Sequence, residues 1–186
     1  VGQTQQTLQI FDDAVNVARS ISDDYYKASA LSDIASELAE AGRFSKAFDV
    51  AGSISRNSDK ASALIDIAWR LAKAGQFDKA LNVAGSIYYN SDKARALRYI
   101  ASELAKAGQT QKALQIFDKA FDVAGSISSN SSKVMAFSDI AKELAKAGQF
   151  DKAVNAAGSI SFDFLKADTL SNIASELAKA GQFDDA

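Results

Sequence analysis

Five short stretches of this chain are copies of one phrase. At residues 67–87 the phrase reads IAWRLAKAGQFDKALNVAGSI, and every copy turns at an Ala-Gly corner. The corner glycines are Gly42, Gly75, Gly108, Gly148 and Gly181. Neighbouring corners are about 33 residues apart, except for Gly108 and Gly148, which are about 40 residues apart. Self-similarity at a period of about 20–50 residues predicts a solenoid, whose units bury their apolar faces only by stacking on their neighbours.

A longer period is superimposed on the short one. Gly2 lies as far before Gly42 as Gly108 lies before Gly148, so the order of one long and two short intervals starts again at Gly108. Residues 108–148 match residues 2–42 at about 26 of 41 positions. The chain is therefore also a repeat of three repeats, in which Gly108 corresponds to Gly2.

Both halves of a unit have the apolar period of a helix. Before the corner at Gly75, apolar residues recur at the i, i+3, i+4, i+7 spacing, at Leu64, Ile67, Ala68 and Leu71. After it, a second stripe comprises Phe77, Ala80, Leu81, Ala84 and Ile87. We call the helix before each corner helix A and the helix after it helix B. Because the corner is so short, the two must form an antiparallel hairpin.

Serine and glycine mark the predicted helix ends. Ser58 and Ser91 suit the N-cap of helix A, and the corner glycine suits the left-handed residue after its last turn. A second glycine follows in helix B, at Gly52, Gly85, Gly125 and Gly158. Because a glycine inside a helix costs roughly 0.5–1 kcal/mol against alanine, we expect a close helix approach there. The alternative is that helix B ends at this glycine.

Two units carry the same seven-residue insertion. Thr110–Ile116 precedes the FDKA phrase, and Thr4–Ile10 is its counterpart. Seven residues are two turns, so helix B grows by about 10 Å with its apolar stripe still in phase. Helix A stays the same length, so we expect the long B helices to step the next layer outward and divide the solenoid into three-unit blocks. The alternative is that the added turns pad an edge.

Composition excludes most catalytic chemistry. The chain has no cysteine and no histidine, so disulfides, thiolate and imidazole metal sites and the commonest general base are all absent. We therefore predict that the protein is not an enzyme and has no catalytic, cofactor-binding or metal-binding residues.

Charge and hydropathy argue against nucleic acid and membranes as partners. With 21 basic and 23 acidic residues, neither nucleic acid nor an anionic membrane surface is favoured. No apolar run approaches the roughly 18 residues of a membrane span, so we expect no membrane partner. From Val1 onward there is no targeting pattern, so a cytoplasmic protein is expected unless a signal peptide has been removed.

The residues around each corner resemble the tetratricopeptide repeat. The family's order of apolar, small, glycine and aromatic positions is matched by Leu64, Ile67, Ala68, Leu71, Gly75, Phe77, Ala80 and Leu81, and the resemblance covers essentially the whole chain. The resemblance implies an all-α, right-handed α-solenoid of antiparallel helix pairs, with about ten helices in a single domain over residues 1–186.

The chain departs from the family's pattern in two ways. The family's unit has about 34 residues and usually a proline after helix B. Here the short units have about 33 residues, the long units have about 40 residues, and proline is absent. The superhelical pitch and neighbouring classes of helical repeat therefore stay open.

The same resemblance implies a binding surface. In the family, helix A lines a concave groove, and its second, fifth, sixth, ninth and thirteenth positions face the ligand. On this chain, serines such as Ser32 and Ser138 occupy many of these positions. The large side chains among them are Ile65, Trp69, Arg95, Arg98, Tyr99 and Met135. Because tryptophan, tyrosine and arginine often anchor interfaces, we predict that these six bind a protein partner. The alternative is that Trp69 packs between repeats and the arginines pair with Asp66 or Glu103.

Three functions of different classes then compete. The first is a scaffold that binds a peptide or a partner helix along the groove. The second is structural: apolar faces on the terminal helices would let copies stack end to end as a homo-oligomer, or would mark a segment of a longer array. The third, a nucleic-acid-binding helical repeat, needs a basic field and a repeating polar pair. Ser32, Ile65 and Arg98, at the fifth positions, show no such code, so we expect no nucleic-acid partner.

Overall fold

The computed structural model of this chain describes the backbone of residues 2–181 and the side chains of residues 6–181. Over this stretch the fold is all-α, with ten helices and no strand, as predicted. The A helices are α2 (Asp24–Glu40), α4 (Asn57–Lys73), α6 (Asn90–Lys106), α8 (Asn130–Lys146) and α10 (Asp163–Lys179). The B helices are α1 (Gly2–Ser20), α3 (Phe44–Gly52), α5 (Phe77–Gly85), α7 (Thr110–Gly125) and α9 (Phe150–Gly158). The start of a further helix B, predicted after Gly181, lies outside the described residues.

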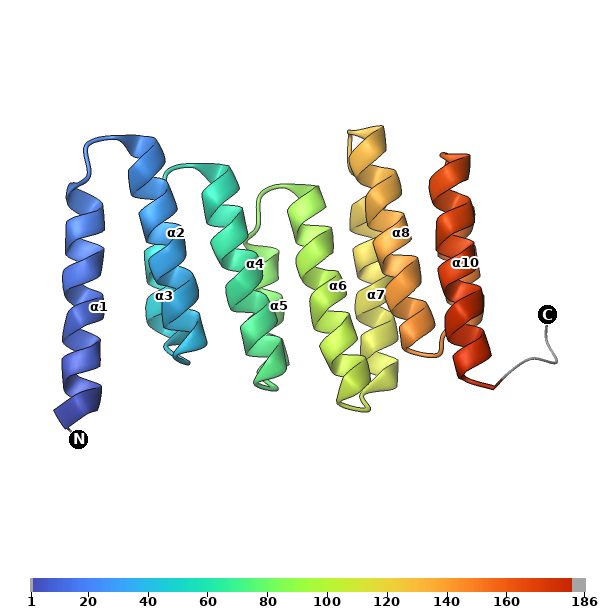
Figure 1. Cartoon of the computed structure of the whole chain (residues 1–186), viewed down its shortest axis with the longest axis horizontal. Coiled ribbons are helices and arrows are strands. Elements are labelled where there is room, and N and C mark those ends of the chain that lie inside the picture. Colours follow the sequence, from blue (N-terminus) through green and yellow to red (C-terminus); the bar gives the residue numbers. More distant parts are fainter. Residues whose placement is uncertain (1, 182–186) are drawn as a thin grey trace. The chain divides into compact units, whose positions relative to one another are not determined.

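The chain divides into two compact units, Val1–Tyr88 with α1 to α5 and Tyr89–Ala186 with α6 to α10. In each unit the main contacts join helices that are one or two apart in the sequence. Within a unit the A helices run side by side, and B helices such as α3 and α7 lie behind them (Figure 1). The right-handed superhelix and the single domain over residues 1–186 stay predictions.

The core of each hairpin consists mainly of the two predicted stripes, with exceptions such as two residues of α5. In α4, Leu64, Ile67, Ala68 and Leu71 are all buried, as predicted. In α5, Ala80 and Ala84 are buried, and Ile87 is buried just beyond the helix end. Phe77 and Leu81, which we also assigned to this stripe, are only half-buried, and Val83 is buried instead.

The hairpin corners confirm the predicted use of glycine. Gly42, Gly75, Gly108, Gly148 and Gly181 all have φ between 71° and 74°, the left-handed region. At the first corner, the N–H of Gly42 donates to the carbonyl of Ala39 at 3.0 Å, and the N–H of Arg43 donates to that of Leu38 at 2.8 Å. These two bonds form the Schellman motif, which satisfies carbonyls that the helix end leaves without partners.

The predicted N-caps are wrong by two residues. Helix α4 begins at Asn57, so Ser58 lies inside its first turn, and Arg56 at the cap position makes no side-chain capping bond. Side-chain caps occur instead on α2 and α8. The carboxylate of Asp23 accepts from the N–H groups of Tyr25 and Tyr26 at 2.8 and 3.1 Å, and the hydroxyl of Ser129 accepts from the backbone N–H of Ser132 at 3.3 Å.

The expected close helix approach at the second glycine is also wrong. The short B helices α3, α5 and α9 and the long α7 all end at this residue, which is Gly52, Gly85, Gly158 and Gly125 respectively. A Cβ added at any of the four would have nothing within 4 Å. The alternative is therefore correct: helix B stops there, and the serine that follows belongs to the connection. The carbonyl of Gly52 accepts a hydrogen bond from the ammonium of Lys60 at 2.9 Å.

The seven-residue insertion lengthens helix B as predicted. Helix α7 has 16 residues, whereas α3, α5 and α9 have nine, and all five A helices have 17. Two turns are thus added to one layer of the hairpin and none to the other. The residues of Thr110–Ile116 account for the whole difference.

The longer α7 changes the alignment of neighbouring A helices within the second unit. Helices α8 and α10 are joined through the short α9, and Lys142 of α8 binds Asp168 of α10. Fewer residues separate Lys142 from Asp168 than make up one short repeat. Helices α6 and α8, joined through long α7, meet at Ser102 and Glu143, whose separation slightly exceeds one long unit. Relative to α6, α8 is therefore displaced along its axis, in the opposite sense to α10 relative to α8 (Figure 1). The added turns do more than pad an edge, while the division into three-unit blocks stays a prediction.

Candidate functional site

The N-terminal halves of α6 and α8 enclose an open cleft of about 270 Å³. Its lining comprises Ser91, Asp92, Ala94, Arg95, Arg98, Ser132, Met135, Ala136, Asp139 and Ile140. Ala94 and Ile140 are buried and provide an apolar base. Two arginines and two aspartates provide charges of both signs. The cleft thus combines a small apolar base with charged side chains of both signs.

Three of the six predicted partner-binding residues line this cleft. Arg95 and Arg98 come from α6, and Met135 comes from α8. Met135 is 63% exposed and has an unbranched, polarisable side chain that adapts to different partners. The side chain of Arg95 is 46% exposed and pairs with Asp92, one turn earlier in α6, at 2.8 Å. Met135 and Arg95 are therefore accessible to a partner.

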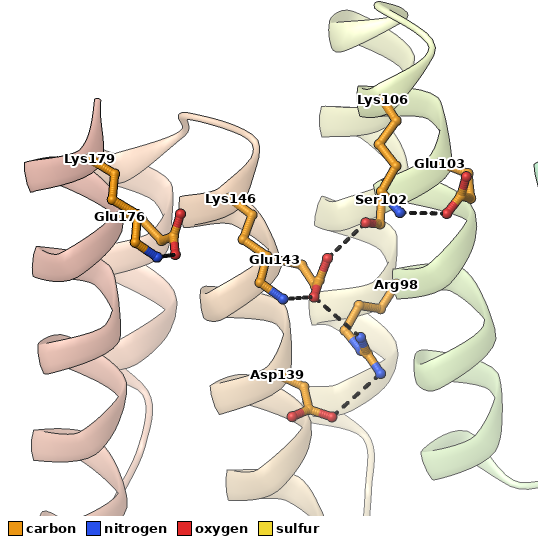
Figure 2. Close-up of polar contacts among 9 residues, drawn as sticks. All are labelled: Arg98, Ser102, Glu103, Lys106, Asp139, Glu143, Lys146, Glu176 and Lys179. Carbon is orange, nitrogen blue, oxygen red and sulfur yellow. Dashed lines mark hydrogen bonds and ion pairs between the residues drawn. The ribbon is translucent and has the colours of Figure 1, made fainter. Parts of the chain in front are cut away.

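Arg98 is held by acidic residues of α8. Its side chain is only 11% exposed, and its guanidinium nitrogens lie 3.6 Å from the carboxylate of Asp139 and 3.9 Å from that of Glu143 (Figure 2). The guanidinium carbon also lies 4.3 Å from the ring centroid of Tyr99, the next residue of α6. Arg98 thus joins α6 to α8, and Tyr99 supports its guanidinium from the same helix.

Glu143 is the centre of a polar network between α6 and α8. It accepts hydrogen bonds from the hydroxyl of Ser102 at 2.7 Å and from the ammonium of Lys146 at 2.8 Å (Figure 2). Burial raises the pKa of the Glu143 carboxyl, but the hydrogen bonds from Lys146 and Ser102 and the charges of Lys146 and Arg98 outweigh it. The pKa is therefore lowered, and the carboxylate stays ionised at neutral pH.

The other two large predicted residues belong to α4, in the first unit. Ile65 is only 7% exposed, so its buried side chain does not offer a partner the surface that we predicted. Trp69 is half-buried, and its ring centroid lies 4.7 Å from the ammonium of Lys73 and 5.7 Å from the guanidinium of Arg70. Trp69 therefore faces cations of its own helix.

The predicted arginines, Arg95 and Arg98, do not pair with the acidic residues that the sequence offered as the alternative. Neither Asp66 nor Glu103 pairs with the predicted arginines: the carboxylate of Asp66 accepts from Arg70 at 2.9 Å, and that of Glu103 from Lys106 at 2.7 Å. Arg70 also binds Glu40 of α2 at 2.9 Å. The hydrogen bond to Asp66 is the main reason that the pKa of Arg70 is raised, and Arg70 stays charged.

Ser138, which the resemblance to tetratricopeptide repeats placed on the ligand-facing surface, is a core residue instead. The hydroxyl of Ser138 is buried and lies 2.7 Å from that of Thr169, which in turn donates to the carbonyl of Leu165. This hydrogen-bonded pair joins α8 to α10. Buried hydroxyls are expected to be paired in this way.

Sequence reasoning missed the acidic half of the site. Asp139 and Glu143 meet Arg98, and Glu143 also meets Ser102, only because α8 is displaced relative to α6. The seven-residue insertion in α7 was the signal that could have predicted this alignment. Repeat position alone could not, because equivalent positions face different neighbours after a short and after a long helix B.

The described residues hold no cluster of three or more acidic side chains able to bind a metal ion. Within the same part of the chain, no helix is long and apolar enough to cross a membrane.

Comparisons with known proteins do not identify a family for this chain. No protein-family model matches the chain, and no curated protein is similar to it. A crystal structure of Ton1535 from Thermococcus onnurineus NA1 aligns with a TM-score of 0.49 and 24% identity. The alignment covers 95% of this chain but 56% of Ton1535, so the chain spans little more than half the length of that protein. A likeness this low carries no argument about function.

Proposed function

We propose that this protein is a scaffold that binds a peptide or a helix of a partner protein across its A helices. The cleft between α6 and α8 is the proposed contact site. The observation that carries the proposal is the combination there of exposed Met135 and Arg95 over the buried apolar base of Ala94 and Ile140. The resemblance to tetratricopeptide repeats supports the same face of the hairpins.

The chemistry of the cleft defines the kind of partner. Arg98 is already neutralised by Asp139 and Glu143, so it holds α6 and α8 together at the cleft and does not offer a free positive charge. Arg95 and Asp139, whose side chains are 46% and 56% exposed, can each reorient toward an opposite charge on a ligand. An apolar side chain placed against Met135, with a charge of either sign beside it, fits this surface best.

The proposal is tested by selecting random phage-displayed peptides on the protein and measuring the affinity of the enriched peptides by fluorescence anisotropy. Met135→Ala and Arg95→Ala should each weaken binding by about 5- to 30-fold, the usual effect of removing an interface anchor. Both side chains are exposed, so neither variant should lose helicity in circular dichroism.

Lys119→Ala is the matched control, because Lys119 is an exposed residue of helix α7 and does not line the cleft. Its peptide affinity should equal that of the wild type. Equal affinity of the enriched peptides for the wild type and for a Met135→Ala, Arg95→Ala double variant would contradict the cleft. Trp69 is the only tryptophan, so a change in its fluorescence would show that α4 also takes part.

Self-association is the second candidate function, and one observation on α10 favours it. The apolar stripe position of α6 and α8, at Leu97 and Phe137, is buried, whereas its equivalent Leu170 in α10 is 38% exposed. A helix B from a second copy of the chain would cover this face as α7 covers α6. Sedimentation at several protein concentrations tests the idea, and a monomer at the highest concentration would contradict it.

A further inference from the structure

Successive B helices are bridged by a recurring ion pair. In the first unit, the ammonium of Lys46 in α3 binds the carboxylate of Asp12 in α1. In the second unit, the ammonium of Lys152 in α9 binds the carboxylate of Asp118 in α7 at 2.6 Å. Each pair joins residues 34 positions apart, at equivalent positions of the repeat. The acidic partner comes from the earlier helix in both cases.

The bridge is missing between α3 and α5. Lys79 of α5 is equivalent to Lys46 and Lys152, but the residue at the same distance before it is Ser45 rather than an aspartate. The ammonium of Lys79 donates instead to the side-chain carbonyl of Gln76, the N-cap residue of α5, at 3.0 Å. Among the described residues, no carboxylate lies within ion-pair distance of Lys79. This position therefore has the cation of the pair without its anion.

An open groove of about 440 Å³ lies at this position between α3 and α5. Phe44, Phe48, Leu71 and Val83 supply its apolar surface, while Ser45 and Lys79 lie at its polar edge. Phe48 is 40% exposed, so its ring is accessible from the groove. The equivalent groove between α7 and α9, of about 400 Å³, includes both Asp118 and Lys152 in its lining.

We propose that the groove between α3 and α5 binds a segment of a partner protein that carries a carboxylate beside a large apolar side chain. The carboxylate occupies the place that Asp118 occupies between α7 and α9 and pairs with Lys79. The apolar side chain packs against Phe44 and Phe48. The chain's own Asp118–Lys152 pair is the template for this contact, and charge complementarity selects an acidic partner over a neutral one.

The probes are the acetylated and amidated tetrapeptides Ala-Phe-Asp-Ala and Ala-Phe-Asn-Ala, titrated while backbone amide shifts are followed by NMR. Both should shift amides of α3 and α5, and the aspartate peptide should bind about 1.5- to 5-fold more tightly, as expected for one exposed ion pair. Lys79→Met should reduce this preference to about 1-fold while the phenylalanine contact remains.

Two reciprocal variants make the test specific. Ser45→Asp supplies the missing anion within the chain and should remove the preference for the aspartate peptide. Asp118→Ser removes the anion between α7 and α9 and should create the same preference there, with new shifts in those helices. Equal affinities of the two peptides for the wild type, a preference that survives Ser45→Asp, or shifts confined to other helices would each overturn the proposal.

Discussion

Glycine has two different roles at the two ends of a hairpin. At the corner, as in Gly75, φ is +73°, a region that is costly for any residue with a Cβ. At the end of helix B, as in Gly85, the backbone is helical and the space around the absent Cβ is empty. The first glycine is required by backbone geometry, whereas no steric reason in the structure requires the second.

Alanine substitution should therefore have opposite effects at these two glycines. Gly85→Ala should stabilise the fold by about 0.4–1 kcal/mol, because it reduces the entropy of the unfolded chain at no steric cost. Gly75→Ala should destabilise it by about 1–2 kcal/mol, the cost of a left-handed alanine. Urea denaturation of the two variants and the wild type measures both changes. A loss of stability in Gly85→Ala would show that the glycine is needed after all.

Glu143 should give the fold a dependence on pH. Because its pKa in the folded state is lowered, its contribution is present above the unfolded-state pKa of about 4.3 and is lost as the pH falls through the folded-state pKa. Glu143→Gln should cost about 1 kcal/mol at pH 7, the difference between charged and neutral hydrogen bonds, and progressively less in acid. Urea denaturation at several pH values between 7 and 3 measures this.

Glu103 is the matched control for Glu143. The two side chains are 15% and 16% exposed, and each accepts from a lysine three residues later. Only Glu143 also meets Ser102 and Arg98 of the neighbouring helix. Glu103→Gln should therefore cost less than about 0.5 kcal/mol at pH 7. Equal costs for the two variants would assign the effect to the local lysine pair.

At the scale of the element, the length of helix B sets the alignment of its A neighbours. The two extra turns of α7 bring Ser102 opposite Glu143, whereas nine-residue α9 leaves Lys142 opposite Asp168. The physical reason is that α8 must start where α7 ends. An insertion of whole turns therefore moves the next helix along its axis without turning its apolar stripe away from the core.

Deleting Thr110–Ile116 should leave the protein folded while removing the contact between Ser102 and Glu143. The deletion joins Gln109 to Phe117 and regenerates the GQFDKA phrase of the short units. In the wild type, Ser102→Ala and Glu143→Gln should show a coupling of about 1 kcal/mol in a double-mutant cycle. In the deletion variant the coupling should fall to near zero.

A five-residue deletion, Thr110–Leu114, is the control. It rotates the rest of α7 by about 140° at 100° per residue and should expose its stripe, with a large loss of thermal stability. If both deletions are tolerated equally, the stripe of α7 does not determine its packing.

At the scale of the whole molecule, the burial of a repeat position depends on which helices pack around it. Leu97 of α6 is 2% exposed, while the equivalent Leu170 of α10 is 38% exposed. The two leucines have the same place in the repeat and the same helix length around them. The difference between them is therefore a property of the array and cannot be read from the local sequence.

Leu97→Ala should cost about 2–5 kcal/mol, as buried leucines usually do, and Leu170→Ala less than about 2 kcal/mol at low protein concentration. If a second copy covers α10, the cost of Leu170→Ala should rise with protein concentration, because association then stabilises the wild type more than the variant. Thermal unfolding over a wide range of concentrations measures this. A cost that is independent of concentration would argue against self-association through α10.

The repeat phrase and its spacing by themselves determined the ten helices, the antiparallel hairpins, the left-handed corner glycines and the longer α7. These features depend on contacts a few residues apart, such as the stripe from Leu64 to Leu71, which periodicity records directly. The tertiary structure alone decided that Arg98 meets Asp139 and Glu143 and that Ile65 is buried. Both depend on how neighbouring helices pack along one another, which brings together residues far apart in the sequence and is not recorded in the periodicity of any one repeat.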